Sequence, residues 1–317
     1  MKELNMAIKI PNFPEYRPLY IEDQLVVNKW IREHPPYSDY NFTSMWTWDI
    51  DGTLKISQLQ GNLVVIFSDY ISSEKFFSFI GTQSINNTIN QLVSYSKHYG
   101  LSEELRLIPE SVIQTLRSES IDGNIKIEED DVNHDYVLSV EKMITMSGKK
   151  LGPKRNFINR FKKKYGDITS VQSLNLTDPK IKKDILNLFC TWQKKAGKTC
   201  KETNEEYKAI IRTLENAHRF DLYAVGIYID DKLVAFSIDE ILHDQYGIIH
   251  YEKADIEKVG IYQFLKQQCA KIFFQKGCKY INYEQDLGIH GLRKAKRSHA
   301  PVNMLKKYKI SPISLVT

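Results

Sequence analysis

The stretch that most constrains the fold is IIHYEKADIEKVGIYQFLKQQCAKIFF, residues 248–274, which begins with a strand pattern and ends with a helix pattern. Apolar residues recur at i, i+3 and i+4 spacing after Gly260, as in a helix that faces a core: Ile261, Phe264, Leu265, Cys269, Ile272 and Phe273. Between the strand and this helix, the segment His250–Asp255 is mostly ionisable. So many charged groups at one strand end make this segment the first candidate for a functional site.

The segments around this element set the order of the fold. Helical patterns cover 178–197 and 204–220, and strand-like runs follow at 221–230, 232–242 and 246–254. With the helix at 260–276 and a strand at 279–285, the order is helix-helix-strand-strand-strand-helix-strand. The first half has a similar order of helices and strands, including a hairpin signal at Gly61-Asn62.

This repetition of element order predicts an α+β protein made of two units built alike, joined near residue 135. We expect domains at 1–134 and 135–317, each with a mixed, mostly antiparallel sheet flanked by helices. No residue identity links the two halves, so the prediction rests on element order alone.

Composition excludes several classes of protein. Hydrophobic residues make up 42% and charged residues 26%, which is ordinary for a globular chain. No apolar run approaches the roughly 20 residues that span a bilayer, and the start MKELNMAIKIPNF does not resemble a secretory signal. The four cysteines show no C-x-x-C pairing and the histidines show no ligand spacing, so no metal site or disulfide framework is predicted. We therefore expect a cytoplasmic protein.

Positive charge is clustered in the second half of the chain. Residues 148–165 carry eight lysines and arginines and no acidic residue, and a second run lies at 293–297. Such runs concentrate phosphates, nucleic acid or anionic lipid head groups near the protein. The alternative for either run is a solvated helix face without a ligand.

The glycine before the helix at 260–276 is a candidate anion site. Main-chain N–H groups at a helix start attract anions, and a glycine lets a phosphate approach the backbone. A strand–Gly–helix element of this kind resembles the one that holds the pyrophosphate of acyl-CoA in the GNAT acyltransferase fold. The candidate cofactor-binding residues are Gly260, Ile261, Tyr262 and Gln263, with Lys154, Arg155 and Arg160 from the basic run.

The loop departs from the Q/R-x-x-G-x-G/A pattern of that fold. Glu257 stands where Gln or Arg is usual, and Tyr262 stands where a small residue is usual. A carboxylate repels a pyrophosphate and a tyrosine ring crowds it, so the sequence argues against ordinary acyl-CoA binding.

Four longer motifs carry a family resemblance. HYEKADIEKVGIYQFLKQQCA, GKKLGPKRNFINRFKKKY, NYEQDLGIHGLRKAKRSHAP and SDYNFTSMWTWD together resemble soluble relatives of the phosphatidylglycerol lysyltransferase C-terminal domain. The resemblance covers nearly the whole chain. It implies a tandem pair of GNAT-like domains related to Fem-type transferases, which take an aminoacyl group from aminoacyl-tRNA. It also implies that the donor site lies in the second domain.

The resemblance leads to a hypothesis for the chemistry. Glu252 or Asp286, each predicted at a strand end, serves as the base or orients the acceptor, and Lys253 or Arg293 stabilises negative charge. The basic run 149–164 would hold tRNA. The alternative is that these charged residues simply pair with one another in a surface network.

The sequence alone is compatible with three functions. The first is transfer of an aminoacyl group to an amine or hydroxyl on a small molecule, peptide or lipid head group. The second is CoA-dependent N-acyl transfer, and the third is a non-catalytic module that binds nucleic acid or phospholipid. With no membrane span predicted, contact with a membrane would be peripheral.

Overall fold

A computed structural model describes residues 9–119 and 124–313 of the chain. Its architecture is mixed α+β, with helices packed on mostly antiparallel sheets, as predicted. The chain divides into two compact units, one running to His134 and including the segment from Leu305 onwards, the other comprising Asp135–Met304. Residues 1–8, 120–123 and 314–317 of the predicted domains lie outside the described residues.

The first unit contains a four-stranded antiparallel sheet in the order β1-β2-β3-β4. Its strands are β1 (Arg17–Pro18), β2 (Lys55–Leu59), β3 (Asn62–Ser68) and β4 (Lys75–Ile80), and its helices are α1 (Gln24–Ile31), α2 (Phe42–Trp48), α3 (Ile85–Tyr99) and α4 (Glu110–Ser118). The predicted hairpin is present, but its turn lies one residue earlier than predicted: Gln60 and Gly61, both with positive φ, form it, and Asn62 is the first residue of β3. A two-residue turn of that kind matches the twist of the strands that it joins.

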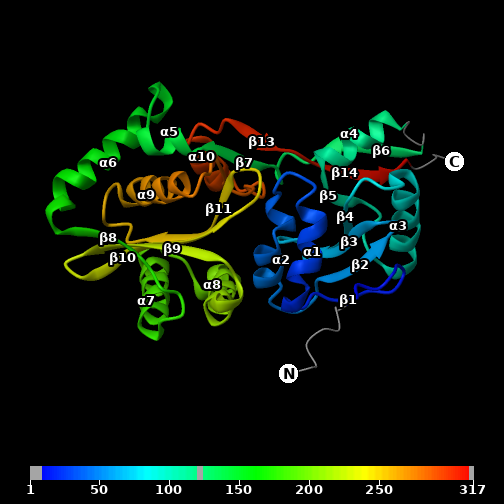
Figure 1. Ribbon diagram of the computed structural model, residues 1–317, viewed down its shortest axis with the longest axis horizontal. Helices are drawn as coiled ribbons and strands as arrows, with labels where there is room; N and C mark the ends of the chain where they lie inside the picture. The colour runs from blue at the N-terminus through cyan, green and yellow to red at the C-terminus, as the bar shows by residue number, and fades with distance from the viewer. Residues whose placement is uncertain (1–8, 120–123, 314–317) are drawn as a thin grey trace. The chain divides into compact units, whose positions relative to one another are not determined.

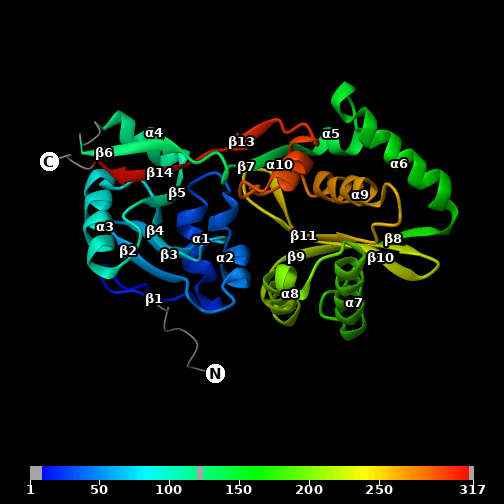
Figure 2. The ribbon, with the colours of Figure 1, turned by 180° about the vertical axis from the view of Figure 1, so that it is seen from behind.

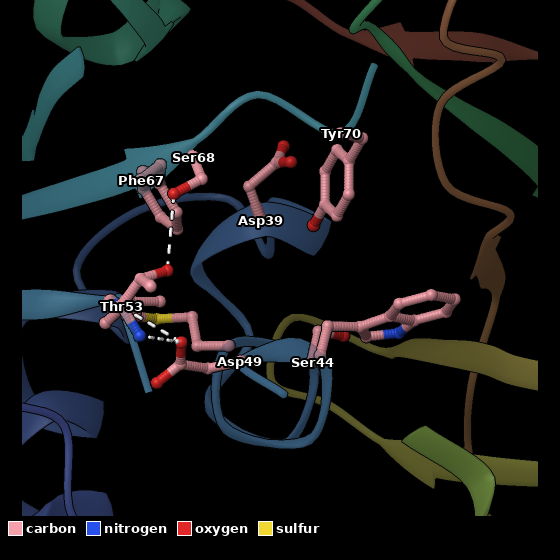
Figure 3. Close-up of a pocket in the computed structure, with 10 residues that line it drawn as sticks. Asp39, Ser44, Asp49, Thr53, Phe67, Ser68 and Tyr70 are labelled. Carbon is pink, nitrogen blue, oxygen red and sulfur yellow. Dashed lines mark hydrogen bonds between the residues drawn. The ribbon is translucent and has the colours of Figure 1, made fainter. Parts of the chain in front are cut away.

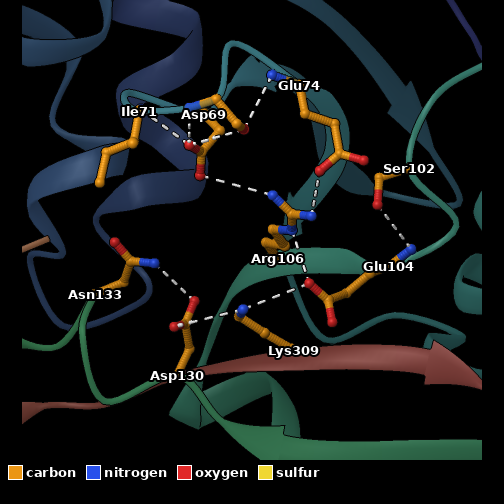
Figure 4. A network of polar contacts seen from close by, with 10 residues as sticks. Asp69, Ile71, Glu74, Ser102, Glu104, Arg106, Asp130, Asn133 and Lys309 are labelled. Atoms are coloured by element: carbon orange, nitrogen blue, oxygen red, sulfur yellow. Dashed lines mark hydrogen bonds and ion pairs between the residues drawn. The ribbon is translucent and has the colours of Figure 1, made fainter. Parts of the chain in front are cut away.

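The last strand that the structure describes belongs to the first unit. Strand β14 (Lys307–Pro312) lies between β5 (Leu105–Pro109) and β6 (Ile125–Glu129) in a three-stranded sheet. Lys309 of β14 lies 3.5 Å from the Glu104 carboxylate within the ion-pair network around Arg106 (Figure 4). The predicted second domain, 135–317, is therefore wrong at its end, because main-chain pairing places the segment from Leu305 with the first unit.

The second unit is built on a seven-stranded sheet, in the order β13-β7-β12-β11-β10-β9-β8. The strands are β7 (Asp135–Ser139), β8 (Thr169–Ser173), β9 (Leu222–Ile229), β10 (Lys232–Ile241), β11 (Tyr246–Ala254), β12 (Tyr280–Asn282) and β13 (Asn303–Leu305). The helices are α5 (Val140–Thr145), α6 (Gly152–Tyr165), α7 (Pro179–Lys195), α8 (Cys200–Glu215), α9 (Ile261–Gln275) and α10 (His290–Arg297). The predicted order from helix to final strand is confirmed as α7, α8, β9, β10, β11, α9 and β12.

Helices cover both faces of the second sheet. Helix α9 packs on one face, against β9, β10 and β11, and α7 with α8 lies on the other face (Figures 1 and 2). Helices α5 and α6 pack on α9 in turn. The described residues also form short 3-10 helices: η1 (Ile21–Asp23), η2 (Ser38–Tyr40), η3 (Lys149–Leu151), η4 (Gly166–Ile168) and η5 (Ala217–Arg219).

Local sequence explains where the helices begin. Asp178 caps α7 with a hydrogen bond from the Lys180 N–H at 2.7 Å, as its Asp-Pro start predicts. Thr199 and Glu202 form a reciprocal capping box at α8. These caps set the first residues of α7 and α8, the two helices on the face of the sheet opposite α9.

The core of the second unit holds α9 close to the sheet. A Cβ atom on Gly247 of β11 would lie 2.3 Å from the Phe273 ring of α9, so only glycine fits there. Phe273 and Leu265 are 1% and 0% exposed. The contact between Gly247 and Phe273 sets the distance between α9 and β11. Replacing a buried phenylalanine with alanine typically lowers the free energy of unfolding by about 3–5 kcal/mol.

Candidate functional site

Strands β11 and β12 separate at the charged strand end. They pair in parallel from Tyr246–Tyr280 to Ile248–Asn282 and no further, although β11 continues to Ala254. Beyond the last pair, the Tyr283 hydroxyl donates to Glu252 Oε1 at 2.7 Å. A side-chain contact therefore bridges two strands whose main chains no longer pair.

Strand register brings Glu252 to the face that α9 covers. Glu252 pairs with Ser237 of β10, and Asp239, two residues along β10, lies on the same face. The register shifts between Ile238 and Asp239, so β11 contains one extra residue there, His250. Without this bulge, Glu252 would lie on the opposite face from Ile249, the partner of Asp239.

Helix α9 supplies the positive partner of Glu252. Lys266 Nζ lies 2.6 Å from Glu252 Oε2, and the Lys266 side chain is 1% exposed. Burial raises the pKa of Glu252, but the charge of Lys266 and hydrogen bonds from Lys266 and Tyr283 outweigh it, so the pKa falls below its usual value. Glu252 is therefore a carboxylate at neutral pH, and it is suited to accept hydrogen bonds.

Asp239 lies on the same face, and no cationic side chain among the described residues forms an ion pair with it. Ser237 Oγ donates to its Oδ2 at 2.8 Å, and its Oδ1 has no hydrogen-bond partner among the described residues. Burial raises the pKa of Asp239 to about 7. The site thus contains two carboxyl groups whose environments separate their pKa values, a pattern found where acid and base roles are divided.

Three basic side chains surround the Tyr283 ring. Lys266 Nζ is 3.8 Å from the ring centroid, Lys296 Nζ is 4.9 Å from it, and the His299 ring lies edge-on with its centroid at 5.6 Å. Lys154 of α6 reaches the same group, with Nζ 3.5 Å from His299 Nε2. Of the predicted cofactor-binding residues, Lys154 therefore points into the site.

Burial changes the protonation of these basic groups. It lowers the pKa of Lys296 to about 8. Burial, reinforced by the charges of Lys266, Lys154 and Lys296, lowers the pKa of His299 well below its ordinary value, so the imidazole is neutral. A lysine that titrates near neutral pH is able to exchange a proton during a reaction.

The other predicted catalytic residues, Lys253, Asp286 and Arg293, form ion pairs with side chains other than Glu252. Lys253 Nζ donates to Glu206 Oε1 and lies 4.5 Å from the centroid of the Trp192 ring. Arg293 and Asp286 do come together, with Arg293 Nε 2.9 Å from Asp286 Oδ2.

Asp286 is enclosed by donors. The Tyr136 hydroxyl donates to Oδ2 at 2.6 Å and the Gly288 N–H donates to Oδ1 at 2.9 Å, in addition to the bonds from Arg293. Burial opposes ionisation, but these bonds outweigh it and lower the pKa of Asp286. Its contacts suit a residue that holds the chain after β12, and its catalytic role stays a prediction.

The space beside Gly260 is filled by protein. A Cβ atom there would lie 2.2 Å from the Phe157 main-chain oxygen and 3.1 Å from Phe161 Cβ, both on α6. Gly260 also has φ +91°, a left-handed conformation that glycine adopts without strain. The close approach that requires this glycine is therefore that of helix α6. The glycine alone does not indicate a phosphate there, and the anion site at this helix start stays a prediction.

The first turn of α9 serves the fold as well. The Tyr262 hydroxyl accepts a hydrogen bond from the Ala254 N–H at 3.2 Å, next to the end of β11. Ile261 is buried in the core, and Gln263 is half-buried. Glu257, which replaces the usual Gln or Arg, pairs with Lys195 at 2.6 Å.

Most of the basic run is an exposed helix surface. Ile158 and Phe161 are the buried residues of α6, and Arg160 with the lysines at 162–164 is exposed. Arg155 donates to the Met146 main-chain oxygen at 2.8 Å at the end of α5. Of the three predicted ligand residues of this run, Lys154 faces the site, Arg155 supports a neighbouring turn and Arg160 faces solvent.

The first unit has a cavity lined by its SDYNFTSMWTWD motif. Asp39, Ser44, Trp48 and Asp49 line it, together with Tyr70 and others, and it contains about 390 Å³ of space including the part open to solvent (Figure 3). Thr53 and Leu54 N–H groups donate to Asp49 Oδ1 at 2.8 and 2.9 Å, so this carboxylate holds a turn.

Metal and membrane signals are absent from the described residues. No group of three His, Cys, Asp or Glu side chains there is arranged to hold a metal ion. Within 9–119 and 124–313, no helix has the length and apolarity needed to cross a bilayer.

Comparison with known proteins identifies the family. The family model described as phosphatidylglycerol lysyltransferase, C-terminal, matches residues 32–311. This chain belongs to that family. None of the curated proteins compared with the chain matches it.

Solved structures share the fold. A conserved protein of unknown function from Bacteroides thetaiotaomicron has 24% identity and a TM-score of 0.80, with 94% of this chain and 99% of that chain covered. The C-terminal domain of a proposed lysylphosphatidylglycerol synthetase from Agrobacterium fabrum has 12% identity and a TM-score of 0.62, covering 91% of each chain. L-PGS from Bacillus licheniformis has 12% identity and a TM-score of 0.60, covering 96% and 94%.

These likenesses show the fold, a mixed α+β architecture with mostly antiparallel sheets flanked by helices, as the sequence predicted. Family and fold together support an acyltransferase-like function for this phosphatidylglycerol lysyltransferase relative.

Sequence reasoning did not find Lys266, Tyr283, Lys296 and His299. Lysine is rarely buried, so a helical pattern assigns Lys266 to solvent by default. One signal was available: α9 has only two charged residues, Lys266 and Lys271, along its whole length. A helix so poor in charge is expected to be buried on most faces, which draws attention to any lysine within it.

Proposed function

We propose that this chain transfers an aminoacyl group from aminoacyl-tRNA to an amine or hydroxyl acceptor, at the opening between β11 and β12. The observation that carries the proposal is the buried contact of Glu252 with Lys266 and Tyr283 at the place where these strands separate. Membership of the lysyltransferase C-terminal family supports the reaction class.

The chemistry follows from the charges of these groups. The acceptor nitrogen or oxygen attacks the ester carbonyl of the donor, a new bond to carbon forms, and the ester C–O bond then breaks. Lys266, an ammonium on a buried helix face, would stabilise the oxyanion of the tetrahedral intermediate. Glu252 would hold the acceptor by its N–H or O–H, because an ionised carboxylate only accepts hydrogen bonds.

Proton transfer completes the step. The acceptor loses one proton as it attacks, and the ribose oxygen of the tRNA gains one as it leaves. Lys296, whose pKa is about 8, is suited to pass the proton between them because both of its forms are populated near neutral pH.

The exposed face of α6 would bind the tRNA. Lys162, Lys163 and Lys164 extend from it without an acidic neighbour on the same helix. Binding by such a surface releases counterions, so affinity should fall steeply as salt is raised.

A CoA donor fits these residues less well. The Tyr262 hydroxyl is bonded to the end of β11, and Glu257 presents a carboxylate where the pyrophosphate of CoA would lie. A thermal-shift comparison of CoA with charged tRNA separates the two donors, since only the true ligand raises the melting temperature.

The decisive experiment uses Glu252→Gln and the matched control Glu257→Gln. Purified full-length proteins are incubated with radiolabelled aminoacyl-tRNA and a panel of amine, hydroxyl and lipid acceptors, and labelled product is measured. We expect the wild type and Glu257→Gln to transfer label and Glu252→Gln to lose at least about 100-fold in rate, the usual size for a positioned charged group.

Two results would count against the proposal. Equal transfer by Glu252→Gln and the wild type refutes the role of this carboxylate. If the wild type binds tRNA but transfers no label to any acceptor, the result favours a non-catalytic binding module. Melting curves of all three proteins establish that each is folded.

A further inference from the structure

An open groove lies between α5 and α9 on the surface of the second unit. It contains about 640 Å³ of space, including the part open to solvent, and most of its wall is apolar. The two helices pack against each other (Figure 1), and the Gln267 side chain of α9 donates to the Ile144 main-chain oxygen of α5 at 2.6 Å. Because this bond holds the two walls together, the groove is formed before anything binds in it.

Each wall of the groove is one stripe of side chains along its helix. The lining residues follow one another at i, i+3 and i+4, and they are Glu141, Ile144 and Thr145 on α5 and Lys271, Phe274 and Gln275 on α9. Both stripes therefore have a charged residue one turn before an apolar residue. The charged residue is an acid on α5 and a base on α9.

The apolar residues of the groove are open to water. Phe274 is 64% exposed, more than any other phenylalanine that the structure describes. Ile144 on the opposite wall is half-buried. Covering an aromatic ring of this kind removes a large apolar area from water, so the groove gains free energy when a partner binds in it.

The two charged residues of the groove have no ion pair within their own chain. Among the residues that the structure describes, no cation lies within ion-pairing distance of the Glu141 carboxylate, and no carboxylate lies that close to the Lys271 ammonium. Lys271 Nζ donates to the neighbouring amide oxygen of Gln268 at 3.3 Å. Opposite charges on the two walls are thus left to pair with a partner.

We propose that a second copy of this chain binds in the groove and forms a two-fold symmetric dimer with the first. A two-fold axis that runs along the groove places α5 of each copy against α9 of the other, as in an interface formed by one surface used twice. Glu141 of each copy then faces Lys271 of the second copy. The Phe274 ring of each copy covers Ile144 of the other.

Charge complementarity selects this occupant and this axis. With the two-fold axis across the groove, each helix would meet its own copy, so that Glu141 would face Glu141 and Lys271 would face Lys271, which is repulsive. A lipid chain or an uncharged peptide would cover Phe274 but leave both charges unpaired. A second copy with the axis along the groove pairs both charges and covers the apolar side chains at once.

The first test measures self-association of the full-length protein by sedimentation velocity, from about 1 µM to about 100 µM. Phe274→Ser removes the exposed ring. The matched control, Leu25→Ser, removes an apolar side chain that is 79% exposed on α1 of the first unit. We expect the wild type to dimerise in this range and Phe274→Ser to raise the Kd of the dimer at least about 10-fold, while Leu25→Ser leaves it unchanged.

The second test reverses the charges. Glu141→Lys alone or Lys271→Glu alone gives each dimer two contacts between like charges, so each variant should associate with itself about 10-fold or more weakly than the wild type does. An equimolar mixture of the two variants should associate as the wild type does, because both of its contacts again join opposite charges. If Glu141 and Lys271 acted on each other within one copy, mixing would restore nothing.

Three outcomes would overturn the dimer. A wild type that stays monomeric over the whole range leaves the groove to another occupant. Equal weakening by Phe274→Ser and Leu25→Ser places any interface elsewhere. A mixture that associates no better than its two components refutes the two-fold arrangement. The substituted positions are exposed and melting curves establish that each variant is folded. Since neither donor nor acceptor is present, these results and those on the proposed transfer reaction are independent.

Discussion

Replacing Gly260 with alanine tests whether helix α6 or a ligand occupies the space beside the start of α9. The added Cβ would lie 2.2 Å from the Phe157 main-chain oxygen and 2.8 Å from its carbonyl carbon. Because these are backbone atoms, no rotation of a side chain relieves the contact, and α6 or α9 must move.

The size of the effect follows from two terms. Holding alanine at φ +91° costs about 1–2 kcal/mol, since L-residues are strained in this region. Overpacking against α6 adds about 1–3 kcal/mol. Gly260→Ala should therefore lower the free energy of unfolding of the second unit by about 2–5 kcal/mol.

Urea unfolding followed by circular dichroism measures this change, and Gly291→Ala is the matched control. Gly291 lies in helix α10 with open space where its Cβ would be, so alanine there should stabilise the helix by about 0.5–1 kcal/mol. If Gly260→Ala unfolds at the same urea concentration as the wild type, α6 does not pack against Gly260 and the space is open to a ligand.

Further predictions concern buried charges. Asp39→Asn leaves the fully buried Lys307 without its carboxylate and should destabilise the first unit by about 3–5 kcal/mol in urea melts, while the double variant Asp39→Asn, Lys307→Met should recover most of the loss; equal stability of both variants would contradict this. Asp239 has its pKa raised from 3.8 to about 7, so the folded state binds a proton that the unfolded state has released between these values, and stability should fall as pH rises across this window. Asp239→Asn should flatten that part of the stability profile, and an unchanged slope would show that Asp239 does not titrate in this way.

The sequence placed ionisable groups at a strand end, where the structure also has them, but it did not identify the residues that contact them. Residues 250–255 are conspicuous because ionisable groups interrupt an apolar pattern, and Glu252 does lie where β11 and β12 separate. Its contacts Lys266 and Tyr283 are 14 and 31 residues away along the chain. Only the packing of α9 over the sheet brings them to the carboxylate.

Gly260 illustrates a signal with two physical causes. A glycine before a helix predicts that something approaches the backbone, and that inference holds. The sequence alone does not distinguish a phosphate from a neighbouring helix, because both require the missing Cβ. The approaching group is Phe157, about a hundred residues earlier, and only the tertiary structure identifies it.

The order of helices and strands, the hairpin around Gly61 and the cap at Asp178 were determined by the sequence itself, since periodicity, turn residues and capping act between near neighbours. Tertiary structure decided that β14 joins the first unit, that Lys296 and His299 lie beside the Tyr283 ring, and that Lys154 contacts His299. The pairing of β14 and the burial of these charged groups both depend on contacts between segments that are distant along the chain. The free energies of such contacts become large only when water is excluded from them.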